Sequence, residues 1–175
     1  MPAAPASKII KWVHTSRPKS KLRRVSFGAT AAIVTSVGLI AGLNAASAAR
    51  SAVVGSLLIV ALADNLTDSL GVHVYQESER LAQRDALRTT LANFATRLLV
   101  SLSFVACALL LPSRVSTCVS VIWGLGLLSG LSYLLARTRG VSPIKEIFKH
   151  CAVALAVIVL SALVGIWVPA WIGIS

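Results

Sequence analysis

A cluster of ionisable side chains lies inside an otherwise apolar part of the chain, at residues 62–80, LADNLTDSLGVHVYQESER. Carboxylate, hydroxyl and imidazole groups of this kind bind divalent cations or exchange protons. On a helix with about 100° per residue, one side carries Asp64, Thr67, Asp68, Gly71, Tyr75 and Glu79, and roughly the opposite side carries His73 and Glu77. The candidate metal-binding residues are therefore Asp64, Asp68, Thr67, Tyr75, Glu79, His73 and Glu77.

The rest of the chain has the composition of a membrane protein. Of its 175 residues, 56% are hydrophobic and 13% are charged, whereas soluble domains are about 25% charged. A helix needs about 20 apolar residues to cross a bilayer, and runs of this length predict spans at 25–43, 52–74, 93–111, 115–136 and 150–172. Lipid offers no partner to an unpaired backbone amide. The sequence therefore predicts an all-α integral membrane protein, with a basic tail (1–24) and a single domain of five transmembrane helices (25–175).

Basic side chains are concentrated in the tail 1–24 and in the segments 75–95 and 137–149, whereas the other two connections hold only Arg50 and Arg114. The positive-inside rule places the N-terminus in the cytosol and the C-terminus on the opposite side. Topology and contacts with anionic lipid explain the net charge of +11 better than binding of nucleic acid does. The expected location is a bacterial inner (plasma) membrane, which the chain crosses several times.

The first predicted span has features of a signal peptide, because LRRVSF precedes it and AASAA follows it. Its apolar part is longer than the core of about 7–15 residues that signal peptides carry. We therefore expect it to be retained as a membrane span.

The two aspartates of the second span lie where charge is costly. Asp64 is about 16 Å from Val53 at 1.5 Å per residue, near the expected midplane, and Asp68 is about one turn nearer the cytosol. An aspartate at the centre of a span costs about 2.5–3.5 kcal/mol, which favours a functional role. Mutual repulsion should favour binding of a divalent cation or a proton. The alternative is a protonated, hydrogen-bonded pair that helps helices to associate.

Three segments resemble the vacuolar iron transporter family: FGATAAIVTSVGLIAG, GSLLIVALADNLTDSLG continuing into YQESERLAQRD, and SPIKEIFKHCAVALAVIVLSALVGIWV. The resemblance covers about residues 25–172. It implies five spans with a cytosolic N-terminus, and a homodimer whose first two helices line a path for ferrous or manganous ions leaving the cytosol in exchange for protons. The chain departs from the family near Ala31 and Ala32, where the family has an acidic residue, and at Asp68, where it has methionine.

The leading hypothesis is a transporter that moves a divalent metal cation, iron or manganese, out of the cytosol by proton exchange. The alternative is a non-transporting membrane protein of this kind with a role in assembly or regulation. An enzyme is not expected, because the sequence has no nucleophile–base arrangement, phosphate-binding loop or H-E-x-x-H motif.

The expected partners are a second copy of the chain, membrane lipid, protons and transported Fe²⁺ or Mn²⁺, with no tightly bound cofactor. Gly38-x-x-x-Gly42 and Gly126-x-x-x-Gly130 would each let two helices approach closely. We expect the homodimer to pack through the first of these motifs.

Overall fold

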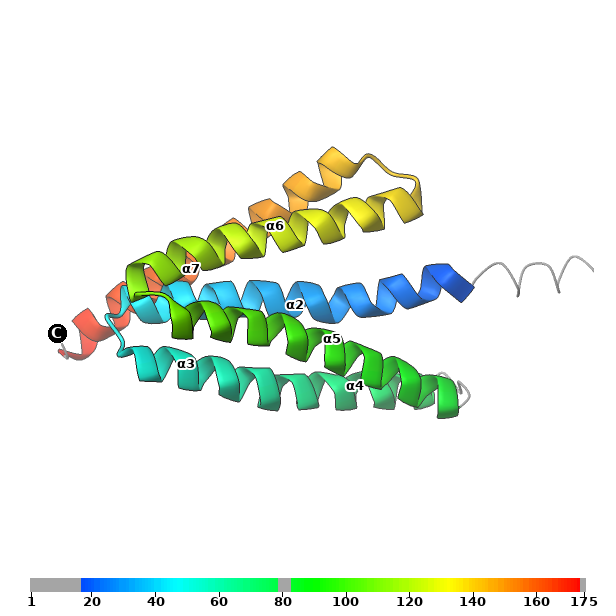
Figure 1. Cartoon of the computed structure of the whole chain (residues 1–175), viewed down its shortest axis with the longest axis horizontal. Helices are drawn as coiled ribbons and strands as arrows, with labels where there is room; N and C mark the ends of the chain where they lie inside the picture. Colours follow the sequence, from blue (N-terminus) through cyan, green and yellow to red (C-terminus); the bar gives the residue numbers. More distant parts are fainter. Residues whose placement is uncertain (1–16, 79–82, 174–175) are drawn as a thin grey trace, which may run out of the picture.

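The computed structural model describes residues 17–78 and 83–173, and their side chains from Ser26 onwards except at positions 83 and 85. The elements are α2 (Arg17–Ala45), α3 (Arg50–Ile59), the π-helical turn η1 (Val60–Asp64), α4 (Asn65–Ser78), α5 (Gln83–Leu110), α6 (Ser113–Arg139) and α7 (Pro143–Ile172). Because α3, η1 and α4 follow one another without a break, the described part of the chain forms five long helices (Figure 1). All five are long and apolar enough to cross a membrane.

Each predicted span lies within one of these helices, apart from position 111. The third and fifth spans differ most: they were expected to begin at residues 93 and 150, but the apolar segments begin at Ala86 and Pro143. The central part of α5 buries the polar side chains of Asn93 and Arg97, and a hydropathy pattern counts such residues as exposed. Within the expected tail 1–24, helix α2 already begins at Arg17, and residues 1–16 lie outside the described part of the chain.

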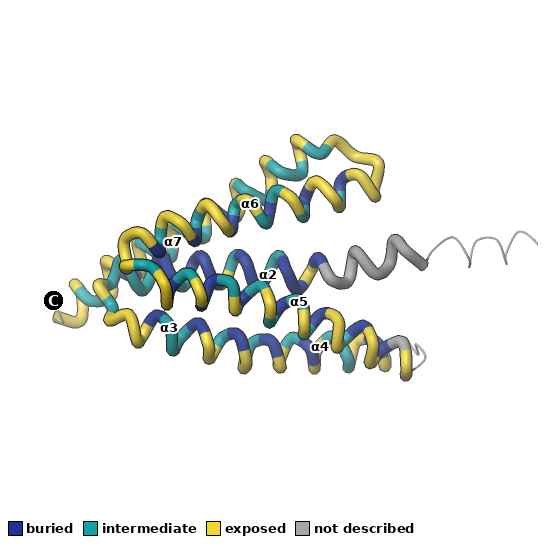
Figure 2. Tube along the Cα trace, in the orientation of Figure 1, coloured by how far each residue is buried: buried dark blue, intermediate teal, exposed yellow. Residues whose placement is uncertain are grey.

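Helix α2 occupies the centre of the bundle and packs against α5, α6 and α7. Helix α5 also packs against α3 and α4, and α6 packs against α7. The largest core side chains meet where α2, α3, α5 and α6 converge; they are Ile33, Val37, Ile40, Leu57, Phe104 and Leu128. Buried residues follow α2 from Ser26 to Ala41, while the outward faces of the other helices are exposed (Figure 2).

The outer surface of the bundle is strongly apolar. Large side chains such as Leu99, Ile122 and Phe148 are mostly exposed, and α7 also exposes Trp167 and Trp171 near its end. Soluble monomers rarely expose contiguous apolar patches on this scale. Such a surface is suited to lipid, and tryptophans near the end of an apolar helix suit the membrane–water interface.

The two ends of the bundle differ in charge. The basic end holds the start of α2, the end of α4, the start of α5 and the α6–α7 connection; the far end holds the α2–α3 and α5–α6 connections and the end of α7 (Figure 1). Described basic residues near the basic end are Arg84, Arg88, Arg137, Arg139, Lys145 and Lys149. At the far end, Arg50 donates from Nε to the carbonyl oxygen of Ala108 (2.9 Å) and from Nη2 to that of Leu109. This cation therefore caps the C-terminus of α5, where the helix dipole favours positive charge.

Helices α2 and α7 approach each other closely at glycines. A Cβ atom added at Gly42 would lie 3.0 Å from the carbonyl oxygen of Ser161, and one added at Gly165 would overlap the carbonyl oxygen of Gly42. A Cβ atom at Gly38 would also contact Ser161, at 3.0 Å from its Oγ. The Gly38-x-x-x-Gly42 motif therefore packs α2 against α7 of the same chain, which corrects the expectation that it forms a dimer contact. The homodimer itself stays a prediction and needs another surface.

Candidate functional site

The π-helical turn η1 determines which side chains of the second long helix face inwards. From Val53 to Ser69, the buried residues of this long helix recur at every fourth position: Val53, Leu57, Ala61, Asn65 and Ser69. An α-helix has about 3.6 residues per turn, so a four-residue repeat drifts by about 40° at each step. The wider turn at η1 compensates for this drift and keeps Asn65 and Ser69 on the buried face. Single π turns within α-helices occur often at functional sites.

Beside this turn, one arginine of α5 contacts both aspartates of the second long helix. Arg97 donates from Nη2 to Oδ2 of Asp64 and from Nη1 to Oδ2 of Asp68. The forked guanidinium can hold two carboxylate oxygens at once, which a lysine ammonium does less well. Nearby, Asn65 donates from Nδ2 to the carbonyl oxygen of Phe94 (3.0 Å) and so helps to fix α4 against α5. We call Asp64, Asp68 and Arg97 the ionic cluster.

The ionic cluster combines a buried cation with half-exposed anions. The side chain of Arg97 is 5% exposed, whereas those of Asp64 and Asp68 are 42% and 33% exposed. Two carboxylates and one guanidinium leave a net charge of −1. The sequence predicted a carboxylate pair that needs a metal ion or a proton to relieve its repulsion. The structure corrects this, because Arg97 already supplies one compensating positive charge.

The other predicted site residues do not join this cluster. The hydroxyl of Thr67 donates to the carbonyl oxygen of Ala63 in its own helix (2.9 Å), and Tyr75 is mostly exposed. His73 and Glu77 form a local pair with 3.3 Å between Nε2 and Oε1, and Glu79 lies outside the described residues. Within residues 17–78 and 83–173, no three His, Cys, Asp or Glu side chains gather as a group that could hold a metal ion.

The sequence did contain a signal for the residues it missed. Arg97 was given no role there, yet Thr89, Asn93, Arg97 and Ser101 recur at every fourth position and are all buried. Polar residues at this spacing lie along one helix face. Opposite them, α4 buries Asn65, Ser69 and Gln76. A polar face on each of two consecutive apolar helices predicts that the two faces pack together.

A second group of charged residues lies at the basic end, between α6 and α7. Glu146 is 3.8 Å from Nε2 of His150, 3.9 Å from Nζ of Lys149 and 4.0 Å from Nη1 of Arg139. The Nδ1 atom of His150 lies 2.8 Å from Oγ of Ser132. These contacts connect the start of α7 to α6.

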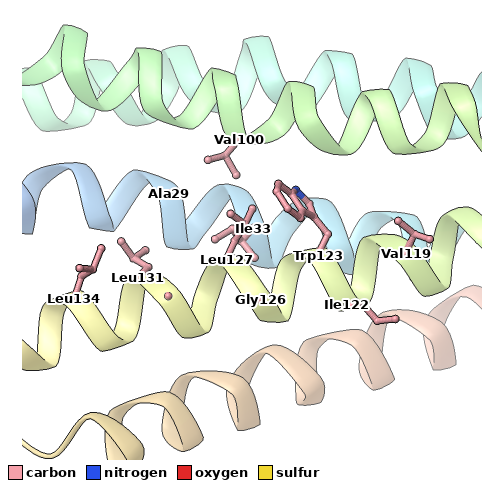
Figure 3. A pocket seen from close by; sticks show the side chains of 11 residues that line it. Ala29, Ile33, Val100, Val119, Ile122, Trp123, Gly126, Leu127, Leu131 and Leu134 are labelled. Carbon is pink, nitrogen blue, oxygen red and sulfur yellow. The ribbon is translucent and has the colours of Figure 1, made fainter.

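A groove between α2, α5 and α6 is entirely apolar. Figure 3 shows Ile33, Val100 and Trp123 pointing into it from these three helices. Gly126 and Gly130 line the same groove, and a Cβ atom on either would meet nothing within 4 Å. The lining residues offer no ligand for a cation, so the groove is unrelated to the ionic cluster.

Comparison of the chain with models of protein families, with curated proteins and with solved structures gives no match.

Proposed function

We propose that the chain is an integral membrane protein that exports a divalent cation, Fe²⁺ or Mn²⁺, from the cytosol in exchange for protons. In this proposal it crosses the membrane five times, with its basic end in the cytosol. The observation that supports this best is the ionic cluster, because Asp64 is at the middle of the apolar segment Arg50–Ser78. At 1.5 Å per residue, each end of that segment is about 21 Å away. Ionisable groups at such a depth are costly and mark ion pathways.

Arg97 would act as a tethered cation that occupies the site when no cargo is bound. A divalent ion requires both carboxylates, so it must displace the guanidinium from Asp64 and Asp68. Binding of one proton to either carboxylate would instead make the cluster neutral while Arg97 stays in place. The metal ion and the proton would then bind in alternation, as exchange transport requires.

The ligand chemistry supports hard cations as cargo. The cluster offers carboxylate oxygens, and such ligands suit Mn²⁺ and Fe²⁺ better than Cu(I), which prefers sulfur. The resemblance to vacuolar iron transporters favours the same two ions.

The paired state of the cluster also favours a second candidate function. An arginine with both carboxylates already bound is what a permanent clamp between α4 and α5 needs. A clamp of this kind would suit a non-transporting membrane protein with a role in assembly or regulation. The two candidates differ in whether the cluster opens to admit a cation.

Transport by the purified protein in sealed liposomes separates these two functions. An imposed Mn²⁺ gradient should drive Mn²⁺ across the bilayer and protons in the opposite direction, measured with a metal-sensitive and a pH-sensitive dye. Asp68→Asn should lower both fluxes by about tenfold or more, since a loss of 1.4 kcal/mol in binding is tenfold in affinity. Thr96→Val is the control, because Thr96 precedes Arg97 but donates only to the carbonyl oxygen of Ala92 (2.8 Å). Normal flux in Asp68→Asn, or no flux in the unmodified protein, would support the clamp.

The proposed topology has its own test. A reporter enzyme that works only outside the cytosol should be active when fused after Ser175 and inactive when fused after Arg139. The reason is that basic residues gather at the end of the bundle where Arg139 lies. Equal activity of the two fusions would contradict a five-span topology.

A further inference from the structure

Helices α4 and α5 carry buried polar atoms that make no hydrogen bond to any described residue. They are Oδ1 of Asn65, Oγ of Ser69, Nδ1 of His73 and Oε1 of Gln76 on α4, and Oγ1 of Thr90 with Oδ1 and Nδ2 of Asn93 on α5. Leaving a buried polar group unpaired destabilises the folded state. Residues Asn65, Ser69, Gln76 and Asn93 are each 6% exposed or less, so they lie inside the protein and not on its outer surface.

These unpaired atoms lie on one side of the ionic cluster. Asn65 is next to Asp64, and Ser69, His73 and Gln76 follow along α4 towards its end at Ser78. Helix α5 runs antiparallel, so Thr90 and Asn93, which precede Arg97, lie on the same side (Figure 1). The polar atoms therefore form a line from the ionic cluster to the basic end.

On the other side of the cluster, beyond Ser101, the buried residues of α3 and α5 are apolar. Helix α3 contributes Val53 and Leu57, and α5 contributes Phe104, Val105 and Ala108, all of which are buried. Phe104 and Leu57 are among the largest fully buried side chains of the protein. This half of the interface therefore closes the cluster off from the far end.

Helix α2 packs closely against the polar line at Asn93. A Cβ atom on Gly28 would overlap the side-chain amide of Asn93. Glycine at this position allows α2 to pass close to α5 while the amide of Asn93 stays between the two helices.

We propose that a file of water molecules occupies the α4–α5 interface from the basic end to Asn65 and gives cations access to the ionic cluster from that end alone. Water satisfies buried polar groups that lack protein partners. Neutral amide and hydroxyl oxygens also solvate a passing cation, and because they carry no net charge they bind it less tightly than carboxylates do. The inference builds on the proposed transport function, for which it supplies the cytosolic half of the path.

Reaction of silver ions with introduced cysteines tests this access. Cys107, Cys118 and Cys151 are first replaced by Ala, and Ser69→Cys and Ser101→Cys are then made separately. Both serines are buried, at 6% and 4% exposed, and the substitution changes only oxygen to sulfur. Ser69 lies on the polar side of the cluster and Ser101 lies one turn beyond Arg97 on the apolar side. Sealed vesicles of each orientation are exposed to Ag⁺, and the remaining thiols are counted with a maleimide after denaturation.

We expect Ag⁺ from the side of Arg139 to block the Ser69→Cys thiol at least about tenfold faster than the Ser101→Cys thiol, because a cation enters an apolar interface only at high cost. Gln76→Cys, nearer the basic end, should react at least as fast as Ser69→Cys. Equal rates at positions 69 and 101, or faster reaction from the opposite side, would overturn the proposal and indicate that the polar side chains pair with one another.

The outcome is separate from that of the transport assay. Asymmetric labelling without Mn²⁺ flux would support the water file while rejecting the transport function. Mn²⁺ flux without asymmetric labelling would reject the water file but would still support the transport function.

Discussion

Replacing both Asp64 and Asp68 by Asn is expected to leave the protein unable to fold stably, whereas either replacement alone is expected to leave it folded. Arg97 is 5% exposed, and within the described part of the chain its ion-pair partners are these two carboxylates. Removing the partner of a buried charge costs about 3–5 kcal/mol, which is a large part of the total stability of about 5–15 kcal/mol that proteins have. A single Asn variant retains one carboxylate, so the two effects should not add.

A compensating substitution shows whether the unpaired charge is the cause. Adding Arg97→Met to the double variant removes the cation and should restore folding, because methionine fills similar space without a charge. Arg84→Met removes an exposed cation from the same helix and should restore nothing. Folded protein is measured as the monodisperse fraction in gel filtration after heating in detergent. If the double variant is as heat-stable as the unmodified protein, the ionic cluster does not hold α4 to α5.

The long helices could be predicted from the sequence because membrane-length apolar runs have few alternatives. In lipid, only helices and closed barrels pair all their backbone amides, so five runs of sufficient length already indicate five helices. The prediction was least accurate for polar residues that are buried between helices, because a hydropathy pattern treats them as exposed. Arg97 and Asn93 lower the hydropathy of α5, yet both are buried between helices. A glycine motif, likewise, indicates a close approach without identifying the helix that approaches, which for Gly42 is α7.

The candidate site was predicted only in part. Asp64 and Asp68 were found from their depth in an apolar run and from their spacing of one turn. Their partner could not be found in this way, because it depends on the register of α4 against α5 and on the wider turn at η1. Helical periodicity assumes a constant rotation per residue, and one π turn changes that rotation for every residue beyond it. The four-residue spacing of buried polar residues in α5 was the signal that could have corrected the prediction.

Arg97→Met alone is expected to convert the ionic cluster into a tighter divalent-cation site. Without the guanidinium, Asp64 and Asp68 repel each other across the low dielectric of the interior, and the variant should be less stable than the unmodified protein. A divalent cation would no longer compete with a tethered positive charge, so the apparent affinity for Mn²⁺ should rise by about tenfold or more, equivalent to 1.4 kcal/mol. At 100 times its dissociation constant, a bound ligand stabilises the folded state by about 2.7 kcal/mol. The melting temperature of the variant should therefore rise with Mn²⁺ much more than that of the unmodified protein.

The control for this result is the variant that combines Arg97→Met with Asp64→Asn and Asp68→Asn. It lacks both carboxylates, so its melting temperature should not respond to Mn²⁺, and Na⁺ at matched ionic strength should reproduce no part of the effect in Arg97→Met. A Mn²⁺ response that is the same in the unmodified protein, in Arg97→Met and in the triple variant would place metal binding elsewhere on the chain. A response confined to Arg97→Met would mean that Asp64 and Asp68 bind the cation and that Arg97 competes with it for them, the competition on which exchange transport by this cluster depends.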